Sequence, residues 1–270
     1  MAAHHRDIPI PPRDERANAR NYHGVRVKLE ASEANEPLLD VSEFGIAGES
    51  YYCRKDGLNA PYYRVLAGGF DKLLLRRGVV ARLKQVNEVL RLFGVEVYVW
   101  DAFRPIACQR ELWDYFMGQA KLKRPNASEE DWKRWSDDYC SDPSGYDPAN
   151  PRTWPTHFTG GAVDLTLRRI CNGELLYMGS VFDDAACVSH TAHFEGIPDQ
   201  ELSASAFDAR ANRRMLYWAM FGAGFSNFPN EWWHYDYGTQ MWVTNRLDEA
   251  GVLRPSEAFY GPAELRDANL

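Results

Sequence analysis

Cysteine is scarce in this sequence, and its spacing fits neither a metal site nor a disulfide framework. The 270 residues include five cysteines, an odd number, and no Cys-x-x-Cys pair occurs among them. This argues against structural zinc held by thiolates and against a disulfide-rich secreted protein, and it favours a reducing cytoplasm. We expect the cysteines to be small, buried or half-buried residues rather than nucleophiles: Cys53, Cys108, Cys140, Cys171 and Cys187.

Long hydrophobic runs and an excess of positive charge are also lacking. No apolar run approaches membrane-spanning length, and the N-terminus has no signal-peptide core before Pro11. The formal net charge is −7, which argues against binding to nucleic acid or to an anionic membrane. We therefore predict a cytoplasmic protein with no nucleic-acid partner and no membrane partner.

Internal repeats and low-complexity tracts are absent as well. Residues 1–24 are polar, with four arginines and three prolines, and predict an extended or poorly ordered N-terminal extension. Residues 25–270 predict a single domain. Within it, residues 118–155 are polar and contain five prolines, which indicates an excursion over the surface with one short helix that Ser128 and Asp131 would cap.

The apolar pattern elsewhere predicts both helices and strands. Spacing typical of helices, with suitable caps and stops, is found over residues 79–93, 106–117 and 203–221. Alternation and β-branched residues predict strands near residues 95–100, 163–167 and 232–237. These elements follow one another without regular βαβ order, so the sequence predicts an α+β fold.

Two short motifs carry side chains suited to metal-dependent hydrolysis. One runs from His157 to Asp164 and contains Gly160-Gly161, and the other is Glu231-Trp232-Trp233-His234. Zinc in catalytic sites takes three protein ligands and leaves its fourth position to water. A neighbouring glutamate can accept the proton of that water as it attacks a carbonyl group. Two imidazoles, one carboxylate ligand and one spare carboxylate therefore predict a hydrolytic metal site.

The spacing of these residues places conditions on the backbone. His157 and Asp164 are seven residues apart, so a regular strand would point their side chains to opposite faces. We predict that Gly160 and Gly161 bend or bulge the strand between them, because two glycines make a helix there costly. Glu231 is expected in the turn before the last strand, where it can face the metal without binding it.

Each motif alone has an ordinary explanation. A histidine among aromatic residues is more often a buried core residue than a ligand, and Glu-x-x-His recurs by chance. Their conjunction favours a metal site. At these residues the chain resembles the D-alanyl-D-alanine dipeptidases, the VanX-type zinc peptidases related to the D,D-carboxypeptidases. Matching motifs occur in family order at residues 100–105, 157–164, 165–167, 178–183 and 231–235.

The resemblance implies a fold and a cofactor. Its fold is a central antiparallel sheet flanked by helices, the D,D-peptidase or hedgehog-like fold. Its cofactor is one zinc ion per chain, held by His157, Asp164 and His234. His190 and His193 match no ligand of the family, and we interpret them as supporting or structural residues.

The resemblance also implies roles for three further residues. Glu231 would be the general base that activates water and later protonates the leaving amine. Arg104 would stabilise the oxyanion, and Asp183 would pair with the free ammonium group of a dipeptide. From the sequence alone, an ordinary surface ion pair for Arg104 and a turn or cap for Asp183 are the simpler interpretations. One departure is Pro155, where the family often has serine, so any contact of that hydroxyl is lost.

We therefore predict a zinc dipeptidase that hydrolyses D-alanyl-D-alanine or a similar D,D-dipeptide, a reaction of cell-wall metabolism. Its partner is a small dipeptide, and the oligomeric state is left open. A D,D- or L,D-carboxypeptidase acting on peptidoglycan stem peptides is the alternative in the same class. A non-haem Fe(II) oxygenase also uses two histidines and one carboxylate, but has little use for Glu231. A binding module without catalysis would not need both Glu231 and Arg104.

Overall fold

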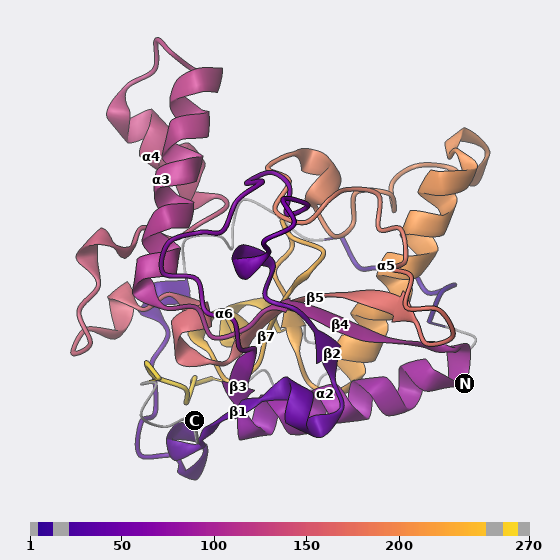
Figure 1. The fold of residues 1–270 in the computed structure, drawn as a ribbon, viewed down its shortest axis with the longest axis horizontal. Coiled ribbons are helices and arrows are strands. Elements are labelled where there is room, and N and C mark those ends of the chain that lie inside the picture. The colour runs from indigo at the N-terminus through magenta and orange to yellow at the C-terminus, as the bar shows by residue number, and fades with distance from the viewer. Residues whose placement is uncertain (1–4, 13–21, 247–255, 264–270) are drawn as a thin grey trace.

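The computed structural model describes residues 5–12, 22–246 and 256–263. Helices and strands are mixed without regular βαβ order, which confirms the α+β class (Figure 1). The strands are β1 (Leu38–Asp40), β2 (Ala47–Gly48), β3 (Leu74–Arg76), β4 (Val95–Asp101), β5 (Ala162–Arg169), β6 (Ser226–Asn227) and β7 (His234–Asp236). The α-helices are α2 (Arg77–Leu90), α3 (Ile106–Lys123), α4 (Glu129–Asp137), α5 (Ala204–Gly222) and α6 (Gln240–Asn245).

A five-stranded sheet in the order β2-β4-β5-β7-β6 forms the centre of the fold, and β1 and β3 form a second, two-stranded sheet. All neighbours in the central sheet are antiparallel except β2 and β4, which pair in parallel. The predicted antiparallel sheet is therefore present with one parallel pair at its β2 edge. Both central strands, β4 and β5, are buried along nearly their whole length.

Two helices cover one face of this sheet. α2 contacts β4, α5 contacts β5 and β6, and the two helices contact each other. Their apolar side chains share the main core with alternate residues of the strands, such as Val97 on β4 and Leu165 on β5. Because side chains of a strand alternate between faces, the intervening residues of β5, Asp164 and Thr166, point to the opposite face. That opposite face carries the site described below.

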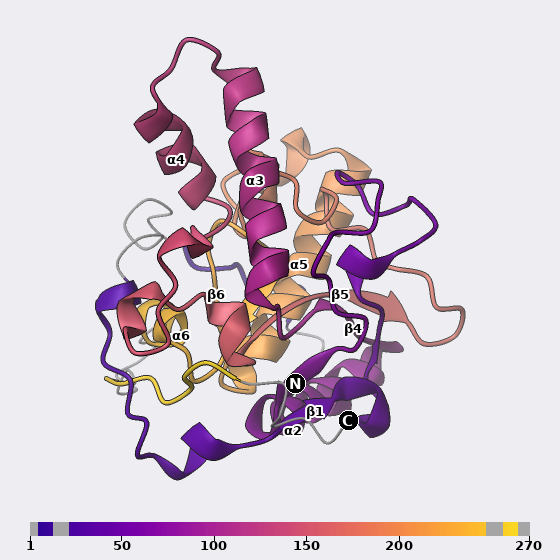
Figure 2. The same cartoon turned by 60° about the vertical axis from the view of Figure 1, so that its left-hand side comes forward.

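The predicted surface excursion is in part a helical hairpin. α3 continues to Lys123, beyond the predicted end of its helix, and α4 turns back beside it. The capping box predicted from Ser128 and Asp131 is present at the start of α4. Figure 2 shows the hairpin standing out from the body of the molecule. After α4 the chain returns to the body and lines the cavity of the site.

The described part of the N-terminal segment lies against the body. Residues 5–12 run beside α5, where Ile8 accepts a hydrogen bond from the Trp218 indole at 2.9 Å. The 3-10 helix η2 (Tyr22–Gly24) packs on α6. The division into an extension and one domain stays a prediction, because residues 1–4 and 13–21 lie outside the described residues. No helix in the described ranges has the length and apolarity needed to cross a membrane.

The cysteine prediction holds in part. Cys108 and Cys140 are buried and Cys53 is half-buried. Cys171 and Cys187 are exposed, so the expectation of burial is wrong for these two. Cys171 lies in the turn after β5, and Cys187 begins a short 3-10 helix, η10 (Cys187–Ser189), in a loop.

Candidate metal centre

Asp164 and His234 face each other across two paired strands. Asp164 on β5 lies opposite His234 on β7, one residue pair beyond the pair formed by Val163 and Tyr235. Val163 and Tyr235 belong to the main core on the helix-covered face. Alternation therefore directs Asp164 and His234 together to the other face.

His157 reaches the same point from outside the sheet. It lies in the 3-10 helix η9 (Thr156–Thr159), so the predicted strand through His157 is wrong, although the predicted bend is present. Gly160 ends the helix in the left-handed conformation with φ 71°, which favours glycine. At Gly161 a Cβ atom would stand 2.7 Å from the Tyr237 carbonyl oxygen, so a side chain would separate β5 from β7. The two glycines turn the chain from His157 into the strand of Asp164.

These three residues form a compact group of potential ligand atoms. Nε2 of His157 lies 3.2 Å from Nδ1 of His234, which lies 2.9 Å from Oδ1 of Asp164. His157 Nε2 is 3.3 Å from Oδ2 of Asp164. Tetrahedral zinc with bonds of about 2.0–2.1 Å separates its ligand atoms by about 3.3–3.4 Å. Within the described ranges this is the one group of His, Cys, Asp and Glu with spacing suited to a metal.

Hydrogen bonds around the group fix which nitrogens face inward. Nδ1 of His157 lies 2.8 Å from the Ala102 carbonyl oxygen, so it carries the proton and leaves Nε2 free. Nε2 of His234 lies 2.8 Å from Oδ2 of Asp236, which leaves Nδ1 free. Two neutral nitrogens and one carboxylate are the ligand state that a divalent metal requires.

Arg104 is buried beside this group rather than forming a surface ion pair. It follows β4, whose register shifts between Val99 and Asp101 so that Asp101 pairs with Asp164. The guanidinium donates to Asp101 Oδ2 at 2.9 Å and to Asp164 Oδ2 at 3.2 Å. Its remaining amino group donates to Gln109 Oε1 at 3.0 Å. These bonds hold a fixed positive charge against the ligand group.

Glu231 lies in the turn before β7, as the sequence predicts. Its backbone N–H donates to the Phe228 carbonyl, and its Oε2 lies 3.9 Å from Nδ1 of His234. Burial, helped by the Asp164 carboxylate, raises the pKa of Glu231 to about 8, against the opposing charge of His234. Such a carboxyl is close enough to act on a bound water, and the raised pKa makes its ionised form a stronger base than an ordinary carboxylate.

Asp183 lies at another wall of the site in an uncommon backbone conformation. Its φ is 57°, in the left-handed region that non-glycine residues seldom adopt. The hydroxyls of Tyr52 and Tyr62 donate to its Oδ2 at 2.9 and 3.0 Å. Burial, helped by Asp164, raises the pKa of Asp183 to about 7, against the charge of Arg104. One oxygen of this carboxylate is thus fixed by two donors, and the other is left for a ligand.

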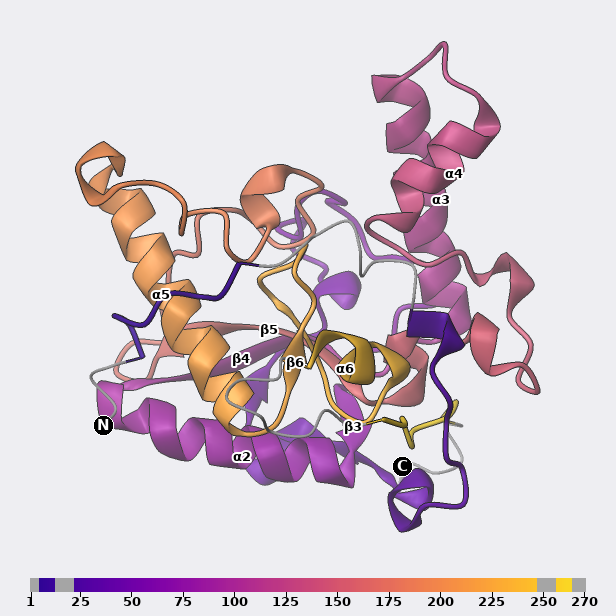
Figure 3. The same cartoon turned by 180° about the vertical axis from the view of Figure 1, so that it is seen from behind.

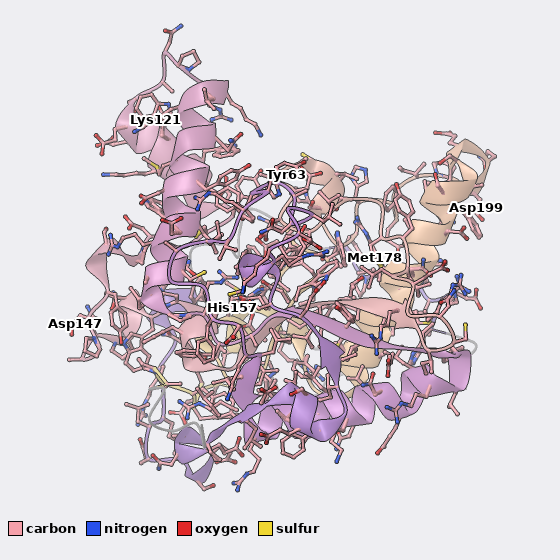
Figure 4. All side chains as sticks on the ribbon, in the orientation of Figure 1. Tyr63, Lys121, Asp147, His157, Met178 and Asp199 are labelled. Carbon is pink, nitrogen blue, oxygen red and sulfur yellow. The ribbon has the colours of Figure 1, made fainter. Side chains whose placement is uncertain are left out.

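One cavity of about 220 Å³ joins all six predicted site residues: Arg104, His157, Asp164, Asp183, Glu231 and His234. Pro155 also lines it. In Figure 4, His157 lies near the centre of the molecule, close to the foot of α3. His190 and His193 lie outside the ligand group. The structure adds Asp236, Tyr52, Tyr62 and Gln109 as supporting residues.

The comparisons with known proteins agree with this geometry. Residues 39–251 match the peptidase M15 family model, described as D-ala-D-ala dipeptidase. The chain belongs to this family. The D-alanyl-D-alanine dipeptidase of Synechocystis sp. is 30% identical over 218 residues, covering 76% of this chain and 85% of that protein. The D-alanyl-D-alanine dipeptidase of Enterococcus faecium is 32% identical over 153 residues, which cover 57% of this chain and 67% of that protein.

Among solved structures, VanYB in complex with D-alanine-D-alanine is 16% identical to this D-ala-D-ala dipeptidase family member. The match covers 64% of this chain and 74% of that chain, with a TM-score of 0.37, which is too low to support an inference. The family match confirms the expected resemblance and the enzyme class, a metallopeptidase. The segment η2, which also lines the cavity, lies upstream of the matched residues.

Proposed function

We propose that this chain hydrolyses D-alanyl-D-alanine, or a similar D,D-dipeptide, to free D-amino acids with one zinc ion. The observation that carries the proposal is the convergence of three ligand-type side chains, a half-buried glutamate, a buried arginine and Asp183 on one cavity. Membership of the D-ala-D-ala dipeptidase family supports it. The cytoplasmic location expected from the sequence stays a prediction.

The residues present fit zinc. His157 and His234 would each offer one nitrogen and Asp164 one oxygen, and the hydrogen bonds to Ala102 and Asp236 already orient the two imidazoles. Two histidines with one carboxylate are a ligand set of catalytic zinc. When bound, zinc supplies a Lewis acid that polarises a carbonyl group and makes water more acidic.

The protein's own residues then handle the proton and the developing charge. Glu231 accepts the proton of the attacking water and returns it to the amine that leaves. Arg104 stabilises the negative charge that develops on the carbonyl oxygen, because its guanidinium is always ionised and its orientation is fixed by Asp101 and Gln109. No reorganisation is needed at the moment of reaction, since these bonds exist before substrate binds.

Asp183 anchors the free ammonium group of the substrate. The cavity volume of about 220 Å³ is small beside the roughly 300–1,000 Å³ of pockets for drug-sized ligands, and suits a ligand of two small residues. A substrate whose amine is acylated would leave the half-buried Asp183 carboxylate without a cationic partner. This favours a dipeptidase over a carboxypeptidase for stem peptides.

Asp183→Asn is expected to raise KM for D-alanyl-D-alanine roughly 100-fold, as loss of one partner of a desolvated, hydrogen-bonded charge pair does. A carboxyl with its pKa raised to about 7 is ionised above that pH and protonated below it. In the wild type, kcat/KM should therefore fall as the pH drops below about 7, and Asp183→Asn should remove this component of the fall. Steady-state kinetics from pH 5 to 9 measures both effects.

N-acetyl-D-alanyl-D-alanine is the matched substrate for this test, because it has no ammonium group. Asp183→Asn should not slow its hydrolysis further. An equal loss on the free and the acetylated dipeptide would show that Asp183 acts on folding or on the metal rather than on the substrate amine.

A panel of dipeptides tests the proposed function itself. Zinc-loaded protein should release D-alanine from D-alanyl-D-alanine and should leave L-alanyl-L-alanine intact. Hydrolysis confined to acylated or longer peptides would overturn the dipeptidase proposal in favour of a D,D- or L,D-carboxypeptidase. If protein with full zinc content hydrolyses no peptide, the dipeptidase and the carboxypeptidase proposals are both overturned.

A further inference from the structure

Three buried apolar side chains line one part of the cavity without joining the main core. Tyr22 comes from η2, Phe228 from the turn before Glu231, and Met241 from α6. Their exposed fractions are 3%, 6% and 7%. They form a small cluster of their own, and all three face the same cavity as His234 and Glu231. Figure 3 shows the indigo segment that carries Tyr22 beside α6.

This cluster is separate from the residues that hold Asp183. The tyrosines that hold Asp183, Tyr52 and Tyr62, belong to the main core, from which the cluster is separate. The ring centre of Phe228 lies 6.0 Å from that of His234, so the cluster begins beside the ligand group. With the ammonium group of a dipeptide at Asp183 and its peptide carbonyl at the ligand group, the cluster beside His234 is available to the second residue.

We propose that Tyr22, Phe228 and Met241 form the subsite for the side chain of the C-terminal residue of the dipeptide. Tyr22 restricts this side chain to about the size of alanine. The inference rests on the proposed function and extends it, because it assigns substrate selectivity to a residue upstream of the segment that matches the family. An apolar wall of this kind accepts a methyl group and offers nothing to a charged side chain.

The position of η2 is fixed by polar contacts with α6. The Gln240 side-chain amide donates to the carbonyl oxygens of His23 and Val25, at 3.2 and 2.8 Å. The His23 ring packs on the Tyr22 ring with 3.9 Å between centroids. A wall held in this way cannot easily move aside for a larger substrate.

The Tyr22 hydroxyl adds a second attachment. It interacts with the Ser141 side chain, in the segment that returns from α4. The Ser141 carbonyl oxygen accepts from Gln109 at 3.0 Å, and Gln109 in turn holds Arg104. The ring and the hydroxyl of Tyr22 therefore have separate roles, and two substitutions can distinguish them. Tyr22→Ala removes the wall, whereas Tyr22→Phe removes only the hydroxyl.

The test compares kcat/KM for D-alanyl-D-alanine and D-alanyl-D-phenylalanine. In Tyr22→Ala, the ratio of the second to the first should rise at least roughly 10-fold over wild type, within the range that removal of a pocket wall gives. Tyr22→Phe should keep the wild-type ratio even if Arg104 is less well held and both rates fall together. Met241→Ala enlarges the same subsite from α6 and should shift the ratio in the same direction.

The outcomes separate this inference from the proposed function. If wild-type protein hydrolyses D-alanyl-D-alanine and neither Tyr22→Ala nor Met241→Ala changes the ratio, the subsite assignment is wrong and the dipeptidase proposal stands. If Tyr22→Ala does not fold, the ratio of the two kcat/KM values in Met241→Ala decides whether the subsite assignment is right. If wild-type protein hydrolyses no dipeptide, both the function and the subsite are overturned.

Discussion

Replacing Glu231 by glutamine is expected to lower kcat for D-alanyl-D-alanine by roughly 10²–10⁴-fold and to leave the zinc in place. Glutamine has nearly the same shape but cannot accept a proton. The loss should appear in kcat more than in KM, because the general base acts in the transition state rather than in substrate binding. Steady-state kinetics and the zinc content of the purified variant measure the two parts of the prediction.

Glu195→Gln is a matched control for this substitution. The Glu195 side chain is 12% exposed, as is that of Glu231, but it pairs with Arg214 and does not line the cavity. It should keep wild-type kcat. A Glu231→Gln variant with full turnover would remove Glu231 from the mechanism, and one without zinc would make Glu231 a ligand rather than a base.

The sequence predicted the parts of the site that depend on local patterns. Alternation along a strand placed Asp164 and His234 on β5 and β7, and the turn before β7 placed Glu231 outside the ligand group. These inferences need only the two-residue period of a strand and a turn signal. The pairing of β5 with β7, which brings Asp164 opposite His234, comes from the structure.

Other features had no local signal. His157 was expected on a bent strand, but a single 3-10 turn ending at Gly160 serves the same purpose with fewer residues. Tyr52 and Tyr62 reach Asp183 from more than a hundred residues away along the chain, so only the tertiary structure reveals them. The segment around Ser141 was interpreted as surface because prolines and polar residues are typical of loops, yet it lines the cavity.

Replacing His234 by alanine is expected to abolish stoichiometric zinc binding and, with it, measurable hydrolysis. Only His157 and Asp164 would remain, and catalytic zinc sites use three protein ligands. The substitution also leaves the buried Asp164 and Asp236 carboxylates without their shared partner, so thermal unfolding must confirm that the variant folds. Exposed His193, which lies outside the ligand group, provides the control: His193→Ala should keep about one zinc per chain.

A milder substitution distinguishes loss of a ligand from loss of its support. Asp236→Asn keeps both imidazoles but weakens the hydrogen bond that orients His234, so zinc affinity should fall roughly 10–100-fold without disappearing. Competition with a chelator of known affinity measures this change. Because His234→Ala removes the ligand atom itself, this variant must lose more zinc affinity than Asp236→Asn does. Full zinc content in His234→Ala would require another set of ligands, and equal affinities for Asp236→Asn and wild type would mean that the β7 backbone alone orients the imidazole.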